Sequence, residues 1–216
     1  MIARLRSVRV GLGMVVLCAA VFWSPFHVEQ GLAQNRKYPQ TILIIRHGEK
    51  TNNEKDVHLS EAGKERAKNL HSLFTASASR PDPFPKPHFI FATHDGENSH
   101  RLVETVTPLA QRLKLPIDQE YHNSLATVIK KNKKAKGIYD LRDEIFRNGK
   151  YAGKTILISW HHGMIPDLAK ELKATDVPAK WGGEVFDRVW KITYDDRGAA
   201  TFTNLPQRLM PGDSPK

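Results

Sequence analysis

The chain has 216 residues, of which 40% are hydrophobic and 26% charged, with 14 Gly, 13 Pro, one Cys and a formal net charge of +10. This composition excludes a disordered tail, a collagen-like repeat and a disulfide-stabilised miniprotein. Since there is only one long apolar run, it also excludes a polytopic membrane protein.

The N-terminal segment is typical of a secretory signal peptide. Three arginines precede an uncharged apolar run at residues 10–23, which is shorter than the about 20 residues that a spanning helix needs. We expect cleavage after Ala33, which gives a signal peptide at 1–33 and one domain at 34–216 that is periplasmic or secreted. The long gap between the run and Ala33 leaves an uncleaved membrane anchor as the alternative.

The single cysteine, Cys18, lies within the predicted signal peptide. A chain cleaved after Ala33 would therefore have no thiol, which excludes cysteine catalysis and thiolate metal sites. The histidines of the remaining chain are scattered and do not form a metal-binding pattern. We expect neither a metal nor a cofactor.

Strands and helices alternate in the first half of the predicted domain. Residues 41–45 and 89–92 are short apolar runs, as expected of strands that are buried on both faces. A helix is expected to begin after Ser60 as its N-cap. Four alternating prolines at 81–87 form an extended connector, and a second helix is expected to begin near 98–99.

The second half continues the alternation. We expect two helical pieces within 125–146, a third buried strand at 155–159, a helix at 165–172, and a hairpin formed by 185–194 and 200–203. This order predicts an α/β fold with three α/β/α layers around a mostly parallel, mixed sheet. Functional sites in such folds lie beyond the carboxyl ends of the strands.

Arginines and histidines follow the predicted buried strands. Arg46 and His47 follow the first strand, Arg101 lies in the helix after the second, and His161 and His162 follow the third. Two arginines favour a doubly charged anion, and a helix N-terminus near Arg101 adds its dipole. A histidine between two cations loses its proton readily and so stays a neutral nucleophile.

The motifs together resemble those of the histidine phosphatase superfamily, also called phosphoglycerate-mutase-like. The resemblance covers about residues 41–213. It rests on RHGEK at 46–50, LSEAGKERA at 59–67, SHRLVET at 99–105 and WHHGMIP at 160–166, with FDRVW at 186–190 and PQRL at 206–209 resembling an exported bacterial subgroup.

The resemblance implies a phosphoglycerate-mutase-like fold and a phosphatase that acts on a small phosphorylated substrate. His47 would be the nucleophile that becomes phosphohistidine, and Arg46, Arg101 and His162 would hold the phosphoryl oxygens. Such chemistry depends on positioning and cationic stabilisation, and a histidine nucleophile divides it into two steps. The alternatives are a mutase-type phosphotransferase and a non-catalytic protein that binds polyanions or the cell envelope.

Two site assignments stay open. Glu120, which lies nineteen residues after Arg101, is the candidate general acid, and Asp95 and Glu97 are alternatives. His161 directly follows the predicted strand, whereas the W-x-H-G spacing of the family favours His162.

A basic run extends from Lys130 to Lys136. We interpret it first as a solvated helix end. Its functional alternative is a surface for anionic lipid or another envelope polyanion. No aromatic residue is interleaved, so we expect no specific nucleic-acid binding.

Overall fold

The computed structural model describes residues 37–53, 55–94, 96, 99–130 and 133–214. The signal peptide or anchor predicted at 1–33 lies outside these residues. Within the described part, no helix is long and apolar enough to cross a bilayer.

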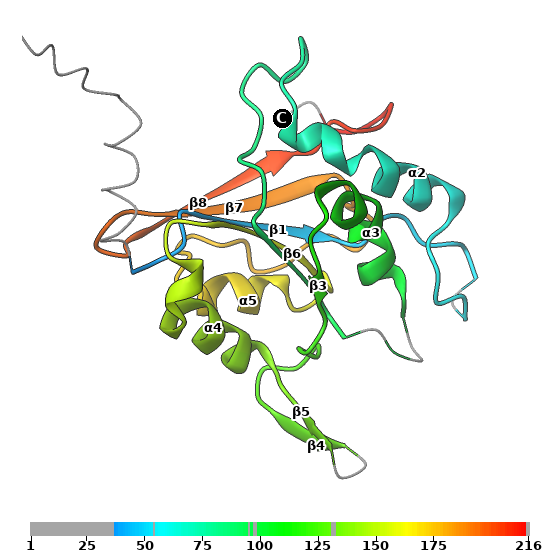
Figure 1. The fold of residues 1–216 in the computed structure, drawn as a ribbon. Coiled ribbons are helices and arrows are strands. Elements are labelled where there is room, and N and C mark those ends of the chain that lie inside the picture. The colour runs from blue at the N-terminus through cyan, green and yellow to red at the C-terminus, as the bar shows by residue number, and fades with distance from the viewer. Residues whose placement is uncertain (1–36, 54, 95, 97–98, 131–132, 215–216) are drawn as a thin grey trace, which may run out of the picture.

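Six strands in the described part form one mixed sheet (Figure 1). The strand order is β3-β2-β6-β1-β7-β8, in which β3, β2, β6 and β1 are parallel and the β7–β8 hairpin is antiparallel to β1. The predicted buried strands and the predicted hairpin are confirmed. The bounds are β1 (Thr41–Arg46), β2 (Phe89–Ala92), β3 (Ile117–Asp118), β6 (Thr155–Trp160), β7 (Arg188–Tyr194) and β8 (Ala200–Pro206).

Helices cover both faces of the sheet, which confirms the predicted three layers (Figure 1). Strand β1 is fully buried, and its alternate side chains belong to two separate hydrophobic clusters: Ile42 and Ile44 on one face, Leu43 and Ile45 on the other. The covering elements are α2 (Glu61–Asn69), η1 (Leu70–Phe74) and α3 (Arg101–Leu113) on the Leu43 face, and α4 (Ile138–Arg147), η2 (Gly149–Tyr151) and α5 (Ile165–Glu171) on the other.

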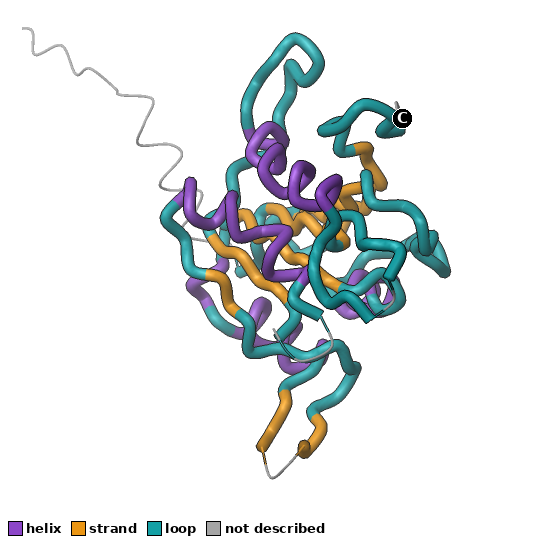
Figure 2. Tube along the Cα trace, turned by 90° about the vertical axis from the view of Figure 1, so that its right-hand side faces the viewer, coloured by secondary structure: helices purple, strands orange, loops and turns teal. Residues whose placement is uncertain are grey.

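The prediction of helix across 125–146 is wrong in its first part. There, β4 (Val128–Lys130) and β5 (Lys133–Ala135) form an antiparallel hairpin that projects from the body in both views (Figures 1 and 2). Leu125, Val128 and Ile129 have helical spacing, but the body of the protein does not cover them: Leu125 is 38% exposed and Ile129 79%. A short helix without such packing is marginally stable. The helix α4 begins only after Gly137, where a Cβ atom would lie 2.6–2.7 Å from three backbone carbonyl oxygens.

Candidate active site

The carboxyl ends of β1 and β6 bring together the side chains predicted to bind an anion. Arg46 ends β1 and is 2% exposed, and His47, which follows it, is 4% exposed. Arg46 pairs with Trp160, so His161 leaves the sheet beside them. The charges of Arg46 and Arg101 and the protonated form of His161 all lower the pKa of His47, as expected of groups that lie in one site.

The imidazole of His47 is held as a neutral base with one defined tautomer. Its Nδ1 lies 2.6 Å from the carbonyl oxygen of Gly48. Because a carbonyl can only accept, Nδ1 carries the proton and Nε2 keeps its lone pair. Burial, followed by the charges of Arg46, Arg101 and His161, lowers the pKa of His47 to about 3. Nε2 is therefore a free nucleophile at neutral pH.

The loop after β1 is fixed by contacts to α2 and α3. The N–H of Gly48 donates to Thr105 Oγ1 at 2.9 Å, and the Thr105 hydroxyl donates to the carbonyl oxygen of Arg101 at 2.7 Å. A Cβ on Gly48 would lie 2.9 Å from the carbonyl oxygen of Gly63, and a Cβ on Gly63 would collide with the carbonyl oxygen of Glu49. Both positions therefore need glycine because the two backbones touch.

A buried ion cluster around Arg66 ties the same loop to the C-terminal tail. The guanidinium group of Arg66 contacts Glu49 at 2.6 Å and Asp213 at 2.7 Å, and Nη1 donates to Gln207 at 3.2 Å. Arg66 is 4% exposed, so its guanidinium group has lost most of its hydration. The carboxylates of Glu49 and Asp213 compensate for that loss. The motif LSEAGKERA thus supplies a structural arginine that anchors RHGEK.

Each site arginine is held on one nitrogen and has an unpaired donor on another. Nη1 of Arg46 donates to carbonyl groups of the loop 182–185, and its guanidinium carbon lies 4.0 Å from the ring centre of Phe186. Nη1 of Arg101 donates to the carbonyl oxygen of Asp56. The Nε atoms of both arginines are buried and have no hydrogen-bond partner among the described residues. Buried donors are normally satisfied, so this pair marks an anion site.

His161, rather than His162, is the histidine whose charge acts on His47. Burial, then the charges of Arg101, His162 and Arg46, lower the pKa of His161 to about 4. Burial also lowers the pKa of His162, followed by the charges of Arg46 and Lys50. Both histidines follow the end of β6 at Trp160, and the charge of Arg46 acts on both, so the preference of the W-x-H-G spacing for His162 stays a prediction.

The structure does not bring Glu120 together with His47. The Glu120 carboxylate pairs with Lys136 Nζ at 2.5 Å, and its side chain is 64% exposed. Its charge is not among those that act on His47. The two alternative acids, Asp95 and Glu97, lie outside the described residues.

Three further contributors lie in segments to which the sequence assigned no role in the site. Glu184 acts electrostatically on both Arg46 and His162, Phe186 packs 5.9 Å from His47 between ring centres, and a backbone carbonyl holds Arg101. The FDRVW motif that begins at Phe186 was the one available signal for this loop. Every residue has a backbone carbonyl, so the contact between Arg101 and Asp56 could not be predicted from residue types.

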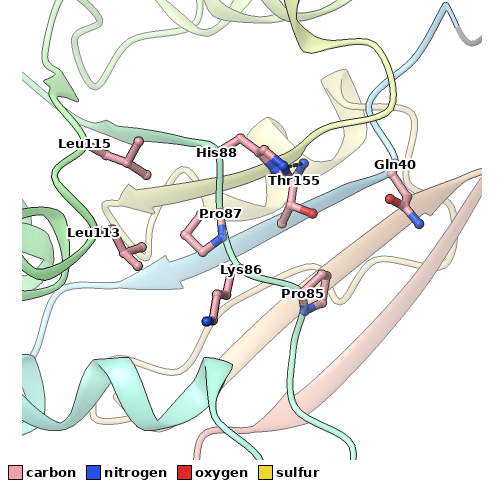
Figure 3. Close-up of a pocket in the computed structure, with 8 residues that line it drawn as sticks. All are labelled: Gln40, Pro85, Lys86, Pro87, His88, Leu113, Leu115 and Thr155. Carbon is pink, nitrogen blue, oxygen red and sulfur yellow. Dashed lines mark hydrogen bonds between the residues drawn. The ribbon is translucent and has the colours of Figure 1, made fainter. Parts of the chain in front are cut away.

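The opposite edge of the sheet carries a pocket of a different kind. Figure 3 shows this cavity of about 620 Å³ near the amino end of β6. Its two titratable side chains are Lys86 and His88, and His88 Nδ1 accepts a hydrogen bond from the backbone N–H of Thr155 at 3.2 Å. It lacks the convergent cations found at the carboxyl edge. In the described part of the chain, no group of three or more His, Cys, Asp or Glu side chains is placed to hold a metal ion.

No family model and no curated protein matches the chain. Among solved structures, it is similar to the protein histidine phosphatase SixA complexed with tungstate, at 13% identity and a TM-score of 0.50, covering 77% of this chain and 97% of SixA. It is also similar to a mycobacterial glucosyl-3-phosphoglycerate phosphatase with inorganic phosphate (13% identity, TM-score 0.48, 76% and 95% covered). A third similar structure is phosphoglycerate mutase from Bacillus anthracis str. Sterne, at 17% identity and a TM-score of 0.44, covering 80% of this chain and 95% of the mutase. At this identity, the likeness to SixA shows a common fold.

Proposed function

We propose that this chain, which has the histidine phosphatase fold, hydrolyses phosphate monoesters through a phosphohistidine intermediate on His47. One observation carries the proposal: a buried, neutral imidazole with a free Nε2 lies beside two arginines whose Nε donors are unpaired. A tetrahedral dianion satisfies both donors while it presents its phosphorus atom to Nε2.

The proposed reaction has two displacements. Nε2 of His47 attacks the phosphorus atom, the ester P–O bond breaks, and the leaving oxygen takes up a proton. Water then attacks the phosphorus atom, the P–N bond breaks, and inorganic phosphate leaves. In both steps Arg46 and Arg101 stabilise the charge on the equatorial oxygens, with His161 beside them. Hydrogen bonds to such charged groups contribute about 1.5–3 kcal/mol each.

Among the described residues, two carboxylates are candidates for the proton donor to the leaving group, while Asp95 and Glu97 stay alternatives from the sequence. Glu120 is the candidate from the sequence, and Glu184 is added because its charge acts on Arg46. An acid contributes about 10²–10⁴-fold when the leaving alcohol is poor. We expect Glu184→Gln to slow an alkyl phosphate far more than p-nitrophenyl phosphate, and Glu120→Gln to leave their ratio unchanged. Steady-state kinetics with both substrates decides, and the reverse pattern assigns the acid to Glu120.

Trapping of the intermediate tests the proposed function directly. Rapid acid-free quenching of protein with ³²P-labelled p-nitrophenyl phosphate should give a label that is stable in base and labile in acid, and His47→Ala should give none. Turnover without label would contradict the phosphohistidine. Conversion of 3-phosphoglycerate to its 2-phosphate isomer would support the mutase alternative. Absence of both label and turnover would support the non-catalytic one.

We also infer export, on the sequence of residues 1–33 alone. N-terminal sequencing of periplasmic or secreted protein should give a chain that begins at Gln34. An intact Met1 in a membrane fraction would instead support the anchor.

A further inference from the structure

A second pocket, distinct from the His47 site, lies at the same edge of the sheet. His94, which lines it, is the second residue after β2, and the last residue of β2, Ala92, pairs with Ser159, two positions before His161. The cavity has about 710 Å³. Its lining is formed by His94, Gln119, Glu120, His122 and the strand residues 133–136.

Backbone hydrogen bonds hold this pocket in place. The N–H of His94 donates to the carbonyl oxygen of Tyr121, and the N–H of His122 donates to that of Lys136, both at 2.7 Å. The two imidazoles stack with ring centres 4.2 Å apart. The base of the β4–β5 hairpin is therefore fixed against the end of β2, even though the hairpin itself projects from the body (Figure 2).

The lining has an excess of positive charge. Its one carboxylate, Glu120, is already paired with Lys136 at 2.5 Å. Lys133 and Lys134 are exposed and form no ion pair with another described residue. The charge of Lys134 also acts on Asp140, which is not part of the lining. Two ammonium groups and two imidazoles around a cavity whose one carboxylate is already paired favour an anion.

We propose that this pocket binds a second anionic group of the substrate, such as a second phosphate. The proposal rests on the proposed function, in which Arg46 and Arg101 hold the phosphate that is cleaved. A substrate with two anionic groups then spans the sheet edge from β1 to β2, and a simple alkyl phosphate fills only the first site. Joining both groups in one molecule makes the second contact intramolecular, which raises the affinity.

Phosphonates test this binding without any need for turnover, because their C–P bond is not hydrolysed. Titration calorimetry compares alkane-α,ω-bisphosphonates of several spacer lengths with the matching alkyl monophosphonates on the wild-type protein. We expect one range of spacer lengths to bind about tenfold tighter than its monophosphonate. Equal affinities of both series at all lengths would overturn the proposal.

Substitutions then locate the gain in affinity. Lys133→Gln/Lys134→Gln should reduce the preference for bisphosphonate to about twofold or less, with monophosphonate affinity unchanged. The control Lys68→Gln/Lys170→Gln removes the same charge from exposed positions on α2 and α5 and should keep the preference. A preference that survives in the pocket variant would also overturn the proposal. Turnover of p-nitrophenyl phosphate, measured separately, tests the proposed function and leaves the binding result intact.

Discussion

At the scale of single residues, burial of His47 links the site to protein stability. Its pKa is about 3 in the folded protein and near 6.5 when exposed. Between these two values the unfolded chain binds a proton that the folded chain does not. The free energy of unfolding therefore falls as the pH falls from about 6.5 towards 3, and it gains nothing from this group above 6.5.

We expect this linkage to be measurable by urea unfolding at pH 7 and at about pH 4.5. Each strongly shifted histidine contributes up to about 1.4 kcal/mol per pH unit to the slope. His47→Gln should reduce the loss of stability on acidification, and His71→Gln, at a partly exposed position, should leave it unchanged. If His47→Gln and wild type have the same pH dependence, His47 is not the buried neutral base described above.

The two neighbouring histidines should differ in their effect on catalysis. Because the charge of His161 acts on His47 and that of His162 does not, we expect His161→Asn to lower kcat/KM by about 10²-fold or more. His162→Asn should lower it by less than about tenfold. Both variants are compared by steady-state kinetics at saturating and limiting substrate. A larger loss for His162→Asn would instead support the assignment predicted from the W-x-H-G spacing.

At the scale of elements, the contact between the loop after β1 and the start of α2 sets the position of the nucleophile. Gly63 lies so close to Glu49 that no side chain fits without movement of the backbone. The loop cannot move away easily, because the N–H of Gly48 also donates a hydrogen bond to Thr105 on α3. Helix α2 is itself fixed there by its N-cap, since Ser60 Oγ accepts from the N–H of Gly63.

We therefore expect Gly63→Ala to lower both stability and activity. Overpacking of this kind costs about 1–3 kcal/mol of unfolding free energy. The displaced loop should also lower kcat more than KM, since His47 moves with it. Gly149→Ala is a matched control, because a Cβ there meets nothing within 4 Å. An unchanged kcat in Gly63→Ala would show that the loop adapts.

Local sequence patterns predicted most elements correctly, because elements that are buried have recognisable apolar residue patterns. The β-branched apolar runs predicted β1, β2 and β6, and Ser60 predicted the start of α2. The prediction failed at 125–135 because lysines are common in helices and in exposed hairpins alike, and the pairing of β4 with β5 is not encoded in residue types.

The site was predictable where its residues follow a strand and not where they arrive from far along the chain. His47, Arg46 and Arg101 carry motif signals. The contacts of Arg46 with the loop 182–185 span more than 130 positions and use backbone carbonyls, which any residue provides. The sequence left the choice between His161 and His162 open, because the two follow the end of β6 directly and differ by a single position.

At the scale of the whole molecule, the Arg66 cluster joins the first strand's loop, the first helix and the tail. Arg66→Met should leave the buried carboxylate of Asp213 and the partly buried carboxylate of Glu49 without their charged partner. We expect it to lower the free energy of unfolding by about 3–5 kcal/mol. Arg147→Met, which removes an exposed ion pair with Asp143, should cost less than about 1 kcal/mol. Urea unfolding measures both. Equal losses would mean that the cluster is no stronger than a surface pair.

The same cluster determines when the site can be completed during synthesis of the chain. Arg66 and Asp213 are 147 positions apart, so a chain that grows from its N-terminus presents the RHG loop long before the tail that completes its anchor. During that interval Arg66 has Glu49 as a partner but not Asp213. The nascent chain therefore contains its nucleophile before the anchor of the surrounding loop is complete, and we expect catalytic competence only after the residues around Asp213 have been synthesised and have docked.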